Sequence, residues 1–319
     1  RGPERLFFDT LGLGDAQHDV VGLATQHRNF SVYSNVGYTY LGKYNLMGSL
    51  RVDRADFFGA EPKYRNRPLW SVGLGWNASE EDFLTNVKWV DFLKLRATYG
   101  VNGNVDQSTT PYTVATRRND NLFQSLQYIN ITQQPNPMLR WEKTATTNLG
   151  LDYSLFNNKL RGSIDVYDRL SSDLLVTTDL DPTVGALTRR INAGELRNRG
   201  IEFSAGSEWF KRGDFRINSN LIIAFNKTKI EKVTRAQGNA SVYISAPADY
   251  FFEGDLYNSL YAYHYGGMTN GYPYVLDENG NPSLTFDANG NPNPTSVKSI
   301  NNPDALVNMG SLMPTYTGS

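Results

Sequence analysis

The 319-residue chain contains no cysteine, so disulfide bonds and thiolate chemistry are excluded within it. It also lacks long apolar runs. The longest notable one covers only residues 221–225, whereas a membrane-spanning helix needs roughly 20 apolar residues. If this sequence crosses a membrane, it must therefore do so as strands of a closed barrel. The formal net charge of -1 gives no electrostatic case for binding nucleic acid or an anionic membrane surface.

Catalytic motifs are also scarce. The three histidines, His18, His27 and His264, stand far apart and lack the spacing of metal ligands. The sequence has no nucleophile elbow, phosphate-binding loop or zinc-protease motif. Neighbouring acids occur at Glu80-Glu81-Asp82, but spacing along a chain cannot establish a glycosidase pair. We therefore expect no enzyme activity, no metal and no cofactor. A surface hydrolase with a convergent acid–base cluster is the weakest alternative.

Turn formers and aromatic residues are abundant. The chain has 28 Gly, 19 Tyr, 16 Phe and 5 Trp, and few stretches repeat with the period of a helix. This composition predicts an all-β chain. Neither the opening Arg1-Gly2-Pro3 nor the closing Thr317-Gly318-Ser319 looks like a natural terminus, so we expect a fragment. A missing signal peptide then says nothing about export.

Apolar and polar residues alternate with the two-residue period of strands that have two different faces. About eight such segments follow one another, at residues 30–40, 44–53, 69–76, 92–100, 147–155, 160–168, 201–208 and 215–226. Their connections alternate between short (41–43, 156–158, 209–214) and long (54–68, 101–141, 171–197 and everything after 226). Connection 77–91 should join the short group, although it is of medium length and carries Phe83 and Trp89. This asymmetry predicts an up-and-down transmembrane antiparallel β-barrel.

Each strand then has one side toward lipid and one toward the lumen. The residues expected to face lipid are Leu149, Leu151, Ile201, Phe203 and Ile217, and those expected to face the lumen are Asp152, Arg161, Asp165, Glu202 and Arg216. Aromatics gather near strand ends, as interfacial girdles do, from Tyr38 and Trp76 to Trp141 and Trp209. The alternative is a soluble β-sandwich acting in carbohydrate binding or adhesion, which alternates in the same way. Strand length favours the barrel, because sandwich strands are shorter.

The chain after residue 226 is dense in loop aromatics. Those that could bind substrate are Tyr250, Phe252, Tyr257, Tyr261, Tyr263 and Tyr265. An equally weighted interpretation is that these rings pack the loops together. Two similar tracts, Asp277 to Pro282 and Asp287 to Pro292, contain Asn-Gly. They lack the ligand spacing of an EF-hand loop, so we expect turns there.

Several of these stretches resemble one family in the same order. They are Leu93-Lys94-Leu95-Arg96 with Tyr99-Gly100, Asn136-Pro137 with Trp141-Glu142-Lys143, Thr147-Asn148-Leu149-Gly150-Leu151-Asp152, Asn198-Arg199-Gly200-Ile201-Glu202, and Met313-Pro314-Thr315. Residues 30–319 resemble the C-terminal part of SusC/RagA-type TonB-dependent outer-membrane transporters. Each motif alone is weak, and the ordered set is specific.

The resemblance implies a 22-stranded barrel around a plug domain that imports oligosaccharides or peptides, energised by TonB. It also implies a SusD-like surface lipoprotein as partner, outer-membrane lipid around the barrel, and a Gram-negative host of the Bacteroidota type. No part of the sequence matches the plug or the TonB-contacting segment. We expect an irregular extracellular lead-in at 1–29, barrel strands over 30–226, and an extracellular region at 227–319 leading to further strands. The chain would resume crossing after Gly318, leaving 227–313 outside the membrane.

Overall fold

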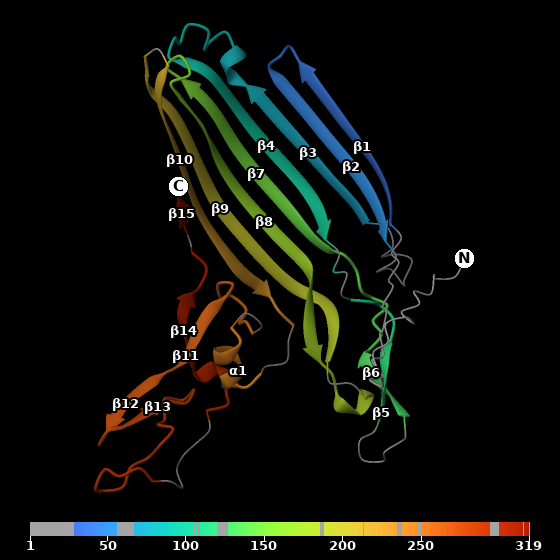
Figure 1. Cartoon of the computed structure of the whole chain (residues 1–319), viewed down its shortest axis with the longest axis vertical. Coiled ribbons are helices and arrows are strands. Elements are labelled where there is room, and N and C mark those ends of the chain that lie inside the picture. Colours follow the sequence, from blue (N-terminus) through green and yellow to red (C-terminus); the bar gives the residue numbers. More distant parts are fainter. Residues whose placement is uncertain are drawn as a thin grey trace, which may run out of the picture.

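One antiparallel sheet dominates the computed structural model (Figure 1). The structure describes residues 29–55, 67–104, 106, 109–119, 127–185, 188–212, 214–234, 238–247, 250–293, 300–314 and 316–318. The sheet has nine strands in the order β1-β2-β3-β4-β7-β8-β9-β10-β15. The lead-in expected at 1–29 lies outside the described residues, apart from Asn29.

The sheet strands are long and pair with their neighbours in sequence. Their bounds are β1 Asn29–Tyr40, β2 Tyr44–Ala55, β3 Arg67–Asn77, β4 Val90–Asn104, β7 Glu142–Leu155, β8 Leu160–Asp179, β9 Thr188–Arg212, β10 Phe215–Lys232 and β15 Tyr316–Gly318. Every one of the eight expected strands is present. The ninth, β15, already pairs with β10 at Tyr316, earlier than the resumption expected after Gly318.

Connections at one end of the sheet are short, and those at the other end are long (Figure 1). The short-turn end holds residues 41–43, 78–89 and 156–159 and the connection from β9 to β10. Connection 78–89, with the 3-10 turn η2 (Ala78–Glu80), thus lies on the side that strand parity predicts. The backbone amide of Phe156 donates to the carbonyl of Trp89, 2.9 Å away, which ties two neighbouring turns together.

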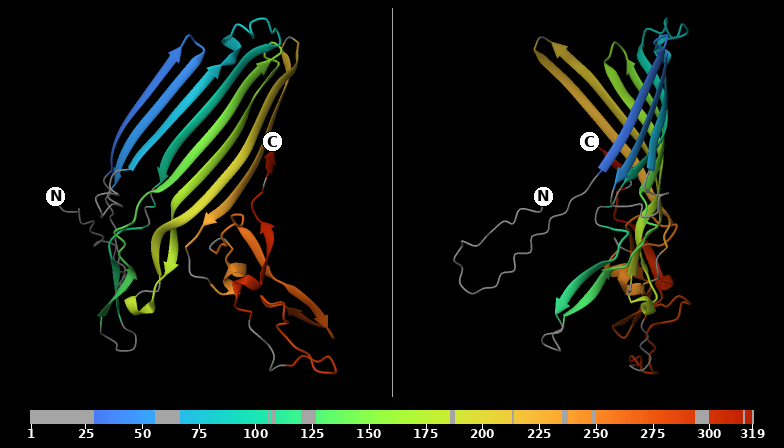
Figure 2. Two further views of the ribbon diagram at one scale, coloured as in Figure 1. Left: turned by 180° about the vertical axis from the view of Figure 1, so that it is seen from behind. Right: turned by 90° about the vertical axis from the view of Figure 1, so that its right-hand side faces the viewer.

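The long-loop end carries smaller elements in two groups (Figure 2). They are β5 Val114–Asn119, β6 Gln127–Gln133, η3 Pro182–Val184, α1 Ala240–Ser245, β11 Ser259–Tyr263, β12 Tyr265–Thr269, β13 Tyr272–Val275, η5 Pro303–Ala305 and β14 Leu306–Ser311. No helix in the described ranges is both long and apolar enough to cross a membrane.

The two Asn-Gly tracts form turns, as expected. The backbone amide of Asp277 donates to the carbonyl of Asn281 at 2.8 Å, and Asp287 bonds Asn291 in the same way at 2.9 Å. In each turn the Asp carboxylate also accepts backbone amides two and four residues on. Gly280 and Gly290 have φ near 80°, which favours glycine.

The expectation of a long connection over 171–197 is wrong, because most of it is strand. β8 runs on to Asp179 and pairs with β9 as far as Thr188. A register shift at Leu174, beside Asp173 with φ of 58°, breaks the alternation there. In the sequence, Leu174, Leu175 and Val176 form an unbroken apolar run that lacks the alternation of a two-faced strand. The bulge explains how this run still belongs to β8.

The segment 136–141 clamps this extension of β8 and β9. The Asn136 side-chain amide donates to the Arg190 carbonyl at 2.8 Å, and the Asn192 side chain accepts the Arg140 amide at 2.9 Å. Leu139 is fully buried. Trp141 is also buried, at 8% exposure, so its expected place in an exposed aromatic girdle is wrong. β10 likewise continues past the expected end at Asn226, to Lys232.

Candidate functional site: a two-faced wall

Strand register sorts the side chains of the sheet into two faces. Residues directly opposite each other in a ladder share a face. One such row runs Leu95, Leu151, Ile164, Phe203 and Ile223 across β4, β7, β8, β9 and β10. The row one residue on runs Arg96, Gly150, Asp165, Glu202 and Ala224. We call these the apolar face and the polar face.

The apolar face is uncovered within the described chain. Leu149 is 58% exposed, Leu74 59% and Phe225 57%. A soluble monomer rarely exposes a continuous apolar patch of this kind, so the face needs an apolar surrounding. Of the residues predicted to face lipid, the ladders place Leu149, Leu151, Ile201 and Phe203 on this face, and Ile217 follows the alternation of β10 onto it.

The residues predicted to face the lumen lie on the polar face. Asp152 stands opposite Ser163, Asp165 opposite Glu202, and Arg161 opposite Ser154. Arg216 follows the alternation of β10 onto the same side, near the short-turn end. The ladders thus separate the two predicted sets, while their exposure to lipid and lumen remains a prediction.

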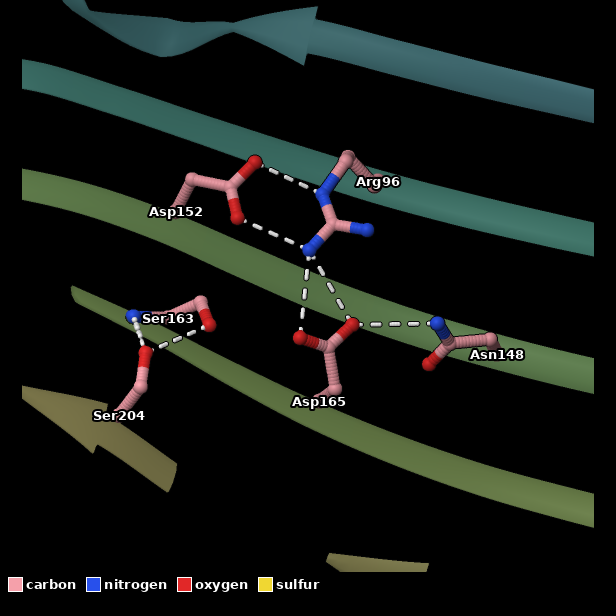
Figure 3. A network of polar contacts seen from close by, with 6 residues as sticks. All are labelled: Arg96, Asn148, Asp152, Ser163, Asp165 and Ser204. Carbon is pink, nitrogen blue, oxygen red and sulfur yellow. Dashed lines mark hydrogen bonds and ion pairs between the residues drawn. The ribbon is translucent and has the colours of Figure 1, made fainter. Parts of the chain in front are cut away.

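Arg96 on β4 joins two of these carboxylates (Figure 3). Its Nε donates to Asp152 Oδ2 at 2.7 Å and its Nη2 to Asp152 Oδ1 at 2.8 Å, a two-pronged contact. Nη2 also reaches Asp165 Oδ1 on β8 at 3.1 Å, where the Asn148 side-chain amide donates from 3.1 Å. One cation therefore serves two anions across three strands.

Gly150 is what allows Arg96 to cross β7. It lies between Arg96 and Asp165 in the ladders. A Cβ at position 150 would lie 2.7 Å from the guanidinium carbon and 2.8 Å from Asp165 Oδ1. The missing side chain leaves the guanidinium room to lie over the backbone of β7. The Leu149-Gly150-Leu151-Asp152 stretch therefore has a structural reason for its glycine.

A second close approach joins β8 to β9. The Ser163 amide donates to Ser204 Oγ at 3.0 Å, and the two hydroxyls are 2.9 Å apart (Figure 3). On the apolar face the Tyr153 hydroxyl donates to the Ser204 carbonyl oxygen at 3.2 Å. A Cβ on Gly162 would lie 1.9 Å from that oxygen. Only glycine fits between these groups.

Sequence reasoning missed the central role of Arg96. The sequence places it only in the alternating segment 92–100 and in one of the stretches that carry the family resemblance. The sequence did contain a usable signal for an ion pair. Lys94 and Arg96 alternate with Leu93 and Leu95, and later predicted strands carry Asp152 and Asp165 in the same kind of alternation. Cross-strand register was the missing information, since it determines which acid a cation meets. The described residues contain no cluster of His, Asp and Glu that could hold a metal ion.

Glu81 lies at the short-turn end and belongs to the run of acids whose spacing could not establish a catalytic pair. Its carboxylate accepts hydrogen bonds from Tyr44 Oη at 2.6 Å, Lys43 Nζ at 2.9 Å and Trp76 Nε1 at 3.1 Å. It thereby fixes the 78–89 connection to the start of β2 and the end of β3. Trp76 also packs against Phe83, with ring centroids 6.4 Å apart.

These contacts predict a pH dependence. The hydrogen bond from Tyr44, with those from Lys43 and Trp76, lowers the pKa of the Glu81 carboxyl from 4.5 to about 2. The stabilisation is complete above pH 4.5 and is lost as pH falls through 2. Glu81→Gln should lower the thermal midpoint of the full-length protein in detergent at pH 6, and the difference from wild type should narrow by pH 3. The exposed neighbour Glu80, changed to Gln, is the control. An equal difference at both pH values would contradict the assignment.

The loop aromatics mostly pack against one another. Tyr243 stacks on Phe252 with centroids 4.6 Å apart and contacts Tyr250 and Tyr261, which is itself buried. Tyr261 Oη donates to Asp255 at 2.8 Å. Tyr257 packs on Phe251, Tyr263 is half-buried, and Tyr265 is 61% exposed. The six predicted substrate contacts thus do not form one surface, and their binding role remains a prediction.

Known proteins resemble this chain in sequence. The family described as "TonB dependent receptor-like, beta-barrel" matches residues 13–308. TonB-dependent receptor SusC of Bacteroides thetaiotaomicron is 31% identical over 282 residues, covering 84% of this chain and 27% of that protein. TonB-dependent receptor P39 of Formosa agariphila is 31% identical over 215 residues, covering 67% of this chain and 20% of that protein. The chain thus spans under a third of these curated relatives.

Solved structures agree on the fold. The structure of the RagAB peptide transporter matches with a TM-score of 0.73 at 24% identity, covering 92% of this chain and 31% of that one. The RagAB peptide importer in its closed-closed state matches with a TM-score of 0.71 at 23% identity, covering 90% and 31%. The predicted all-β class and barrel architecture are confirmed, and the soluble sandwich alternative is wrong.

Proposed function

Because the chain belongs to the TonB-dependent receptor-like β-barrel family, with homologues of SusC and RagA type, we propose that it forms one wall of an active importer in the outer membrane. The family transports rather than catalyses, and its homologues here are of the Bacteroidota type. The observation that carries the proposal is the division of the sheet into an uncovered apolar face and a charged polar face.

The faces fit a barrel wall physically. Leu95, Leu151 and Phe203 lie in one row of the apolar face, where acyl chains would replace the missing protein core. Arg96, Asp152 and Asp165 lie on the other face with side chains 20–30% exposed, as water in a lumen would allow. On this basis the five apolar residues predicted for lipid face lipid, and the five charged ones face the lumen. The short-turn end faces the periplasm and the long-loop end the exterior.

The lining favours hydrated cargo. It offers a guanidinium, carboxylates, an amide and hydroxyls, at Arg96, Asp152, Asp165, Asn148 and Ser163. Such groups can exchange hydrogen bonds with hydroxyls or peptide groups, whereas an apolar solute would gain little from them. We therefore propose oligosaccharides or peptides as cargo, a SusD-like lipoprotein as the surface partner and TonB as the energy-transducing partner of the whole protein. The loop residues from Tyr250 to Tyr265 lie on the side from which cargo would enter.

The orientation of the faces can be tested with spin labels. The chain has no native cysteine, so Leu151→Cys and Asp152→Cys provide single adjacent labelling sites once any cysteine elsewhere in the full-length protein is removed. In liposomes, the label at 151 should be relaxed by oxygen dissolved in lipid, and the label at 152 by a water-soluble nickel reagent. Labels at both sites reporting the same surrounding would rule out the wall. Phe203→Cys and Glu202→Cys are a second pair on β9.

Transport needs a separate assay in cells. Deleting the gene should abolish uptake of a labelled oligosaccharide pool or a labelled peptide pool, and complementation with the full-length gene should restore it. A gene copy lacking its TonB-contacting segment is the control that separates active import from leakage. Undiminished uptake of both pools in the deletion strain would contradict the proposed cargo classes without affecting the wall orientation.

A further inference from the structure

A cluster of cations interrupts the outer rim of the apolar face. On this face Arg199 lies between Asp168 of β8 and Lys227 of β10, and Arg197 lies opposite Lys229. We call Arg197, Arg199, Lys227 and Lys229 the cationic patch. Each is placed by the same alternation that puts Ile201 and Phe225 on the apolar face. The patch therefore points the way the lipid-facing residues point, and away from the lumen.

The patch begins where the apolar band ends. Arg199 is two residues from Ile201, and Lys227 two from Phe225, which is roughly 6–7 Å along a strand. Cations at that distance from an apolar band lie at the depth of lipid headgroups. Strands β3 and β4 differ, since Trp70 of β3 faces Val101 of β4 near the same end. On β2, Arg54 follows Val52 onto this face. Four cations therefore gather on β9 and β10, where β3 and β4 carry none at this level.

The ion pairs leave the cationic patch with a net positive charge. Arg197 Nη2 and Arg199 Nε both bond Asp168 Oδ2, at 2.6 and 3.0 Å, so two guanidinium groups share one carboxylate. Lys227 and Lys229 are exposed, and neither side chain has a hydrogen-bond or ion-pair partner among the described residues. The next acids, Glu195 and Glu231, lie farther from the apolar band, where Lys232 is opposite Glu195.

A groove connects the patch to the band. It has a volume of about 730 Å³, and its lining includes the apolar residues Leu149, Val166, Ile201 and Phe225 and the charged residues Asp168, Arg199 and Lys227. An apolar floor with a cationic rim complements a molecule that has hydrocarbon chains and an anionic head. Arg binds phosphate with a planar fork and Lys with a compact charge, so this pair of residue types suits phosphate.

We propose that this groove binds a phosphorylated glycolipid of the outer leaflet. Its phosphate would lie against Arg199, Lys227 and Lys229, and an acyl chain would lie along Ile201 and Phe225. Asp168 positions the two arginines and is not itself a ligand. The assignment to the outer leaflet rests on the proposed function, because it requires the long-loop end to face the exterior. We specify a glycolipid because phosphorylated glycolipid is the anionic lipid in the outer leaflet of a Gram-negative outer membrane.

The test uses the full-length protein, purified in a neutral detergent, with diphosphorylated lipid A as the probe. Binding is followed by native mass spectrometry or by a thermal-shift titration. Lys227→Gln with Lys229→Gln should weaken binding by about 25-fold, because each lysine beside an anionic headgroup strengthens binding by roughly fivefold. Lys159→Gln, an exposed lysine in a turn at the opposite end, is the matched control and should bind as wild type. Heat-modifiable migration on gels shows that each variant is folded.

Three results would overturn the proposal. They are unchanged affinity in the double variant, equal affinity for dephosphorylated lipid A, and stronger binding of an inner-leaflet phospholipid such as phosphatidylglycerol. The spin-label experiment separates this outcome from failure of the proposed function. Labels at 151 and 152 that report lipid and water, together with unchanged lipid A binding in the double variant, would leave the barrel wall standing and remove only the lipid site.

Discussion

Among the glycine-to-alanine substitutions in this sheet, Gly162→Ala should lower the free energy of unfolding the most. The new Cβ would lie 1.9 Å from the carbonyl oxygen of Ser204 and 2.9 Å from its carbonyl carbon, both backbone atoms that move only with β9. Displacing that strand also breaks the hydrogen bond from Tyr153 and disturbs the paired hydroxyls of Ser163 and Ser204. Overpacking of this kind costs about 3 kcal/mol. Urea unfolding of the full-length protein in detergent, followed by tryptophan fluorescence, measures it.

Gly48→Ala provides the matched control. Gly48 lies on the same face of the sheet, opposite Val36 and Val72, and a Cβ there meets nothing within 4 Å. Alanine also restricts the unfolded chain more than glycine does, so this variant should be neutral or slightly stabilising. Comparable destabilisation of both variants would show that the effect comes from losing glycine in a strand, and would contradict the close approach of β8 to β9.

Arg96→Glu should have the second largest effect. It removes the cation that joins Asp152 and Asp165 and places a third carboxylate beside them. Losing charge-assisted hydrogen bonds costs roughly 1.5–3 kcal/mol, and partial exposure of these groups to water keeps the loss toward the lower part of that range. Like-charge repulsion adds to it, so we expect about 2–3 kcal/mol for Glu and about 1–2 kcal/mol for Arg96→Gln. The same urea titration applies.

Salt and a neighbouring arginine provide the controls. The difference between the Glu and Gln variants should shrink in 1 M salt, where the Debye length falls to about 3 Å. Arg161 shares the polar face and has no carboxylate partner among the described residues. Arg161→Glu should therefore change stability little. If Arg161→Glu and Arg96→Glu were equally harmful, the net charge of the wall would matter and the specific three-strand contact would not.

The two-residue alternation of apolar and polar residues was enough to predict the strands of the sheet. Each strand of the main ladder that the sequence indicated is present, and the division of Leu149 and Leu151 from Asp152 needs only a period of two. Turn chemistry was equally local, since Asn-Gly tracts predicted the turns at Gly280 and Gly290. Even the end of the sheet at which connection 77–91 lies could be predicted, because strand parity determines that end whatever the length of the connection.

What could not be predicted depends on register and on distant segments. The contact of Arg96 with Asp165 joins residues 69 positions apart and exists only because Gly150 lies between them. The strand character of 171–197 was hidden by the bulge at Leu174, and it is held by 136–141, which no local pattern connects to it. Burial of Trp141 has the same origin. Aromatic content near a strand end does not distinguish a ring in a lipid interface from one that is buried by packing within the protein.

The clamped extension of β8 and β9 determines how force can pass between the loops and the membrane. β8 has 20 residues, of which about 9–11 are needed to span, so roughly 30 Å of it can protrude as paired strand. A hydrogen-bonded ribbon of that length, fixed laterally by Asn136 and Arg140, resists bending. In the proposed orientation, a displacement of η3 at its tip would pass along this paired ribbon to the wall that carries Asp165.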